Sequence, residues 1–78
     1  MIINGKQYGF TVLPYWDMVQ AVIFKVENFK DGESYNLAIL TKEFGSIFRR
    51  PIEQDYINAR KWAENQMRYI FEANQPTP

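Results

Sequence analysis

The chain has 78 residues, and nine basic residues balance nine acidic ones. It has no cysteine and no histidine, which excludes disulfides, thiolate metal sites and the commonest general base. A hydrophobic content of 46% argues against disorder. We expect a single domain over residues 1–74 and a frayed tail over 75–78. Without cysteines, a leader pattern or a long apolar run, the predicted location is the cytoplasm of a bacterial or phage-infected host cell, away from membranes.

The N-terminal half shows the alternation of apolar and polar residues that is typical of β-strands. After Ile2-Ile3, the Asn4-Gly5 pair suits a tight turn, and the first main strand is predicted over Lys6–Leu13. Pro14 lacks a backbone donor, so a strand must end there or lie at a sheet edge. Tyr15-Trp16-Asp17 is interpreted as a turn.

Two further strands follow. Met18–Val26 is apolar on both faces, which is typical of a central strand. A turn centred on Asp31-Gly32 leads into the strand predicted over Tyr35–Thr41. The spacing of these runs predicts an antiparallel meander.

The C-terminal half predicts an irregular segment and then a helix. The segment Lys42–Arg50 is expected to be anchored by Phe44 and Phe48, with a short strand at 46–48 as an option. Pro51 suits the first turn of a helix expected over Ile52–Ala73. Its predicted apolar stripe comprises Ile52, Tyr56, Ala59, Ala63, Met67 and Ile70. The expected fold class is α+β: an antiparallel meander of three or four strands, followed by one long C-terminal helix on one sheet face.

Carboxylates are the remaining option for acid–base chemistry. Asp31 and Glu33 lie in a predicted turn, while Glu53 and Asp55 lie in the first helical turn. Turn formation and favourable charge at a helix start account for these pairs. No phosphate-cradling glycine motif is present. We therefore expect no enzyme activity, cofactor or metal site.

The aromatic residues point to a protein partner. Tyr15 and Trp16 lie in a predicted turn, and Trp62 and Tyr69 are seven residues apart on the helix. Tyr and Trp are enriched at binding surfaces, so these four residues are the protein-binding candidates. An alternative is that Trp62 and Tyr69 pack beneath the N-terminal segment or the 42–50 loop. A homodimer through the open sheet face or an edge strand is a further expectation.

In size, lack of catalytic residues and aromatic content, the chain resembles the small stand-alone proteins with which bacteriophages block host machinery, including anti-CRISPR proteins. This resemblance implies a non-enzymatic inhibitor that occupies a site on its target.

The alternative hypothesis is a DNA-binding module. Three strands followed by a helix with the run Ala59–Ala63 resemble the arm-binding domains of phage-type integrases, in which the sheet face meets DNA. Few basic residues lie on the predicted strands, which departs from that pattern. The nucleic-acid-binding candidates are Lys42, Arg49, Arg50 and Lys61. Arg49 and Arg50 have an alternative role as ion-pair partners of Glu53 and Asp55.

Overall fold

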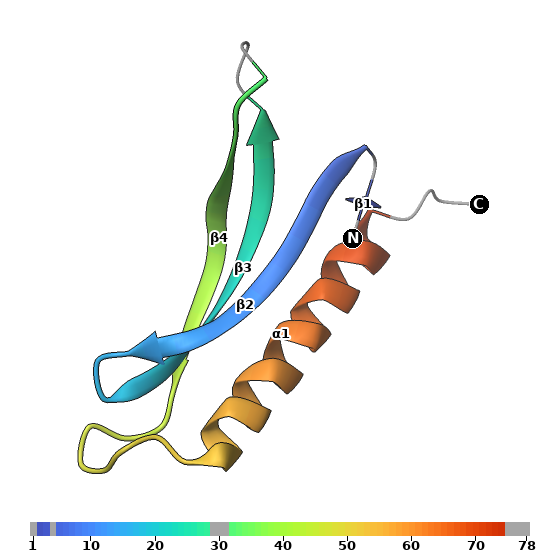
Figure 1. Ribbon diagram of the computed structural model, residues 1–78. Coiled ribbons are helices and arrows are strands. Elements are labelled where there is room, and N and C mark those ends of the chain that lie inside the picture. Colours follow the sequence, from blue (N-terminus) through green and yellow to red (C-terminus); the bar gives the residue numbers. More distant parts are fainter. Residues whose placement is uncertain (1, 4, 29–31, 75–78) are drawn as a thin grey trace.

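The chain forms a four-stranded antiparallel sheet followed by one C-terminal helix, which confirms the predicted α+β class (Figure 1). The computed structural model describes residues 2–3, 5–28 and 32–74. The predicted turn residues Asn4 and Asp31 and the tail 75–78 lie outside that range. The strands, in sheet order, are β1 (Ile2–Ile3), β2 (Lys6–Tyr15), β3 (Met18–Asn28) and β4 (Ser34–Phe44), and the helix is α1 (Glu53–Ala73).

The strands are longer than predicted. β2 continues through Pro14, opposite Val19 of β3, because β1 covers only Lys6 and Gln7 on the outer edge of β2. At a sheet edge, the missing proline N–H does not remove a hydrogen bond between strands. The last three residues of β4 come from the segment predicted to be irregular, and the optional strand at 46–48 is wrong because these residues form a loop with a turn.

The helix begins one residue later than predicted. Ile52 is the N-cap, so Pro51 precedes the helix rather than lying in its first turn. Two members of the predicted stripe, Ile52 and Tyr56, are exposed, and Asp55 is buried instead. The prediction was wrong at the N-terminal end of the helix because a hydrogen-bonded carboxylate, rather than an apolar side chain, occupies the buried position.

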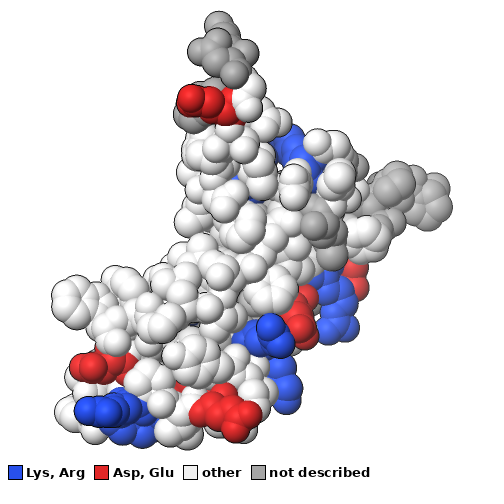
Figure 2. Space-filling view, viewed as in Figure 1, with Lys and Arg blue, Asp and Glu red and all other residues white. Residues whose placement is uncertain are grey.

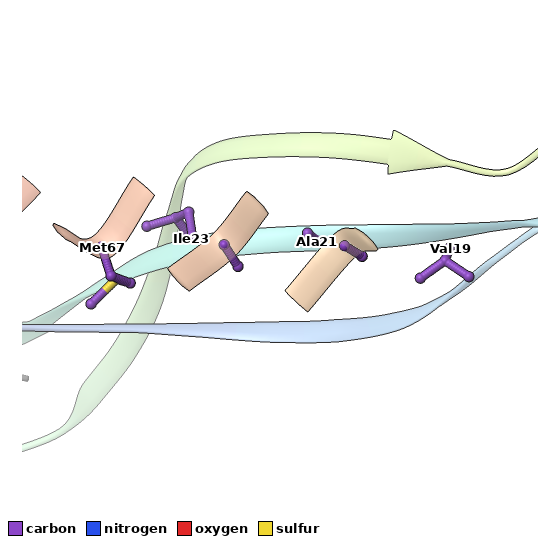
Figure 3. Packing of buried hydrophobic residues seen from close by; sticks show 6 residues of the cluster. Val19, Ala21, Ile23 and Met67 are labelled. Carbon is purple, nitrogen blue, oxygen red and sulfur yellow. The ribbon is translucent and has the colours of Figure 1, made fainter. Parts of the chain in front are cut away.

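The core lies between β3 and α1. Val19, Ala21 and Ile23 alternate along the helix-facing side of β3, and all three are fully buried (Figure 3). Small side chains at Ala59 and Ala63 let the helix approach this strand closely, and Met67 lies beside Ile23. Partly buried side chains extend the core: Tyr8, Phe10, Val12, Phe44, Trp62 and Ile70.

The opposite sheet face is not covered by any described element. Its centre is Phe24, whose ring lies across Gly9 of β2. A Cβ at Gly9 would come within 2.6 Å of the Phe24 Cζ, so a larger residue there would have to displace the ring. The aromatic ring thereby covers backbone that the glycine leaves bare.

The molecule is thin and open for its size. Its extents are 44 × 37 × 14 Å, and the β3–β4 hairpin projects away from the helix (Figure 1). The radius of gyration is 14.7 Å, whereas a compact chain of this length has about 11.5 Å. The accessible surface is 5984 Å², whereas a compact 9.3 kDa protein exposes about 5,000 Å². The chain therefore exposes about 1,000 Å² more than a compact monomer does.

Candidate protein-binding site

Two connections leave the sheet at the same end. Val19 pairs with both Pro14 and Phe44, so the β2–β3 turn and the β4–α1 loop adjoin the same part of β3 (Figure 1). We call the exposed apolar side chains of these connections the loop end, which comprises Tyr15, Trp16, Ile47 and Phe48. Figure 2 shows mainly uncharged atoms projecting there, with acidic and basic groups beside them.

Trp16 is held in an unusual conformation. Tyr15 and Met18 are the last paired residues, so Trp16 and Asp17 form a two-residue turn. Trp16 has φ 56°, and no other described non-glycine residue has a positive φ. Turns of this length favour glycine or asparagine where φ is positive. The indole is nevertheless 88% exposed, with one edge contact to Tyr15 at 6.5 Å between ring centroids.

The β4–α1 loop presents a second exposed aromatic ring. The Phe48 N–H donates to Ser46 Oγ at 3.1 Å, and the Arg49 N–H donates to the Ser46 carbonyl at 3.4 Å. These bonds close a tight turn that leaves Phe48 91% and Ile47 69% exposed. The expectation that Phe48 anchors the loop is therefore wrong, whereas Phe44 does pack, edge-on against Trp62. Ser46 satisfies the turn internally, so burying Phe48 is not needed to order it.

A buried carboxylate fixes this loop to the helix. Arg49 donates from Nη1 and Nη2 to Asp55 Oδ2 and Oδ1, at 2.7 and 3.0 Å. The Ile52 N–H donates to Asp55 Oδ2 at 2.9 Å, which satisfies one of the free donors at the helix start. Gly45, with φ 108°, lies close to the Asp55 carboxylate, so that a Cβ at this position would be 3.3 Å from Asp55 Oδ2. These contacts hold the β4–α1 part of the loop end in place against the helix.

The same contacts set the charge of the pair. Hydrogen bonding from Arg49, followed by that from the Ile52 N–H, lowers the pKa of Asp55 to about 2. Asp55 in turn raises the pKa of Arg49. Both groups are therefore ionised over the whole range in which proteins normally work.

The helix candidates occupy different environments. Trp62 is half-buried, with its ring centroid 6.1 Å from that of Phe44. Tyr69 is 61% exposed. The structure thus places Tyr15 and Trp16 together at the loop end and Trp62 and Tyr69 along α1.

The basic candidates are spread over three elements. Lys42 lies on β4 with its Nζ 5.4 Å from the Phe44 ring centroid. Arg49 is bound to Asp55, and its neighbour Arg50 is exposed in the loop. Lys61 is exposed on α1, where acidic and basic side chains alternate (Figure 2). Because Arg49 already donates two hydrogen bonds to a buried carboxylate, only part of its guanidinium is left to contact a phosphate.

An apolar groove also runs between β2 and α1. Its volume is about 530 Å³, and it is lined by Tyr8, Gly9, Phe10, Glu64, Met67, Arg68 and Phe71. No group of three or more acidic, histidine or cysteine side chains suited to a metal ion occurs within the described ranges. No helix among the described residues is both long and apolar enough to cross a membrane.

Sequence reasoning identified Tyr15 and Trp16 but missed Ile47 and Phe48 as surface residues. The available signal was Ser46 just before two apolar residues, because a serine hydroxyl can close a turn locally. Comparison of the chain with protein-family models, curated proteins and solved structures finds no match.

Proposed function

We propose that this protein is a non-enzymatic protein-binding module that acts by occupying a site on its target through the loop end. The single observation that carries this proposal is Trp16. Its left-handed backbone costs about 1–2 kcal/mol, and its indole gains little packing within the chain because it is 88% exposed. A partner pocket that receives the ring would offset that cost.

The surroundings of Trp16 support the same role. Trp and Tyr side chains at the centre of an interface often supply much of its binding energy when they enter well-packed pockets. The Arg49–Asp55 pair and the Ser46 turn order the loop before a partner arrives, which reduces the entropy lost on binding. A phage-type inhibitor that blocks host machinery is the finer form of this proposal.

The test is binding of the tagged protein to proteins of a bacterial lysate treated with nuclease, followed by affinity measurement with the purified partner. We expect Trp16→Gly to weaken binding by at least about 30-fold, the effect of a residue worth 2 kcal/mol. Tyr69→Ser is the matched control because it removes an exposed aromatic ring from α1. That variant should bind as the wild type does.

Three results would contradict the proposal. Loss of binding with Tyr69→Ser but not with Trp16→Gly would assign recognition to the helix. Recovery that requires nucleic acid and is lost with Arg50→Ala would favour the DNA-binding alternative. Retention on lipid vesicles without a protein partner would assign the exposed aromatic rings to a membrane surface.

A further inference from the structure

The strand β4 is a long sheet edge with an unpaired side. Ten of its eleven residues pair with β3, and within the part of the chain that the structure describes no other strand pairs with β4. Tyr35, Leu37, Ile39 and Leu40 are each between 41 and 44% exposed. A long edge with exposed apolar side chains is a template for pairing with another strand.

The other edge of the sheet is protected, whereas the first half of β4 is not, because the bulge at Ile39 and the charges of Lys42 and Glu43 lie beyond residue 38. β2 carries Gly9 and Pro14, and β1 covers its first two residues. Proline at an edge and a short covering strand are common devices against strand addition. Ser34–Phe44 contains neither proline nor glycine. Strand addition is therefore favoured at β4.

We propose that β4 pairs with β4 of a second copy of this chain, antiparallel and about a two-fold axis at Asn36. Two copies of one edge strand related by a two-fold axis form a self-complementary interface. The four-stranded sheet would then continue from one copy into the other. This surface is separate from the loop end, so the inference goes beyond the proposed function.

The bulge in β4 determines which residues can pair. Leu40 lies opposite Ile23 and Ala38 opposite Phe24, so Ile39 has no partner on β3. The alternation of faces shifts by one residue at Ile39, and opposed residues in a regular ladder must share a face. A symmetric ladder therefore lies on one side of Ile39, within either 34–38 or 40–44.

Charge selects the first of these segments. The 40–44 segment contains Lys42 and Glu43, and two-fold symmetry there would bring each close to its own copy. Like charges opposite one another destabilise a sheet. The 34–38 segment has no charged residue. With Asn36 opposite itself, Tyr35 faces Leu37 of the second copy, which is a favourable aromatic–aliphatic pair.

The surface area and net charge of the chain fit a second copy. The chain exposes about 1,000 Å² more than a compact monomer, summed over the whole molecule, and a standard stable interface buries about 800 Å² of each partner. Its formal net charge is zero, so two copies have no overall repulsion. The β3–β4 hairpin projects beyond the helix, which leaves room for the second copy at the 34–38 segment (Figure 1).

The first test is the mass in solution at about 100 μM, well above the Kd of a typical standard-size interface. We expect the wild type to have twice the 9.3 kDa mass of the chain. Asn36→Lys should halve that mass, since two lysines would oppose each other at the axis. Thr11→Lys, which places the same charge at an exposed position of β2, should remain dimeric.

The second test uses cross-linking, because the chain has no cysteine of its own. Opposed residues of an antiparallel ladder have Cα atoms about 4.5–5.5 Å apart, within the range of a disulfide. Asn36→Cys should therefore oxidise to a covalent dimer, and Thr11→Cys should not. This readout does not depend on how well the Asn36→Lys variant folds.

A monomeric wild type would overturn the proposal. A dimer in which Asn36→Cys fails to cross-link, or in which Thr11→Cys cross-links equally well, would place the interface elsewhere. The Trp16→Gly variant should keep the mass of the wild type, so failure of the dimer and failure of the proposed function are distinguishable.

Discussion

At the scale of single residues, Trp16 combines a strained backbone with an exposed side chain, and this makes a stability prediction possible. Trp16→Gly relieves the strain of φ 56°, whereas Trp16→Ala keeps the Cβ that causes it. We expect the free energy of unfolding of the glycine variant to be about 1 kcal/mol higher than that of the alanine variant. Urea denaturation of both variants measures this difference, and an alanine variant as stable as the glycine one would disprove strain at Trp16.

Asp55 should make stability depend on acid pH. Its pKa in the folded chain is about 2, below the usual 3.8, so folding favours the ionised form. That contribution is complete above the usual pKa and is lost as the pH falls from about 4 towards 2. We expect the melting temperature of the wild type to fall over this range more than that of Asp55→Asn. Parallel acid-induced losses in the two proteins would contradict this assignment.

At the scale of elements, the packing of α1 on β3 depends on small side chains. Ala63 is fully buried against β3, so Ala63→Leu adds volume where none is free. Overpacking of this kind costs about 1–3 kcal/mol. Ala73→Leu, at the exposed end of the helix, is the matched control and should change stability by less than about 0.5 kcal/mol. Thermal or urea unfolding of the two variants provides the comparison.

The elements could be predicted from sequence where the apolar pattern is local. Alternation at Tyr8, Phe10 and Val12 identified the buried face of β2, and Pro51 placed the helix start within two residues. The pairing of Arg49 with Asp55 was one of the predicted alternatives and is confirmed, whereas the burial of Asp55 could not be predicted because it depends on how the loop packs against the helix. The extension of β4 through Lys42 and Glu43 was not predicted because both residues are charged, although an edge strand tolerates charged residues.

The loop end was only partly predictable for the same reason. Trp16 lies in a turn that the sequence indicates, but its positive φ follows from the register of β2 and β3 on either side. The exposure of Phe48 depends on a hydrogen bond to Ser46 that leaves its ring without a cover. A single sequence shows which apolar residues are present, whereas the tertiary contacts decide which are buried.

At the scale of the whole molecule, the open shape predicts a stability that depends on concentration. If two copies pair through β4, dissociation accompanies unfolding, and the melting temperature rises with protein concentration. We expect this rise for the wild type and not for Asn36→Lys. A wild-type melting temperature that is constant over a 100-fold dilution from about 100 μM would speak against the dimer.

The proposed dimer also has a consequence for binding geometry. The axis at Asn36 lies towards the β3–β4 hairpin tip, whereas the loop end follows Phe44 at the other end of the strand. The two loop ends would therefore point in opposite directions. Such a dimer suits two target molecules, or two well-separated sites, better than a pair of adjacent sites.

The contact between Phe24 and Gly9 has a spectroscopic consequence. The tip of the ring lies close to the glycine backbone, so its circulating π electrons should move the resonances of the Gly9 α-protons away from their usual positions in a proton NMR spectrum. These signals would report directly on the uncovered sheet face. A ligand that settles on that face would displace the ring and move them, whereas occupation of the loop end would leave them in place.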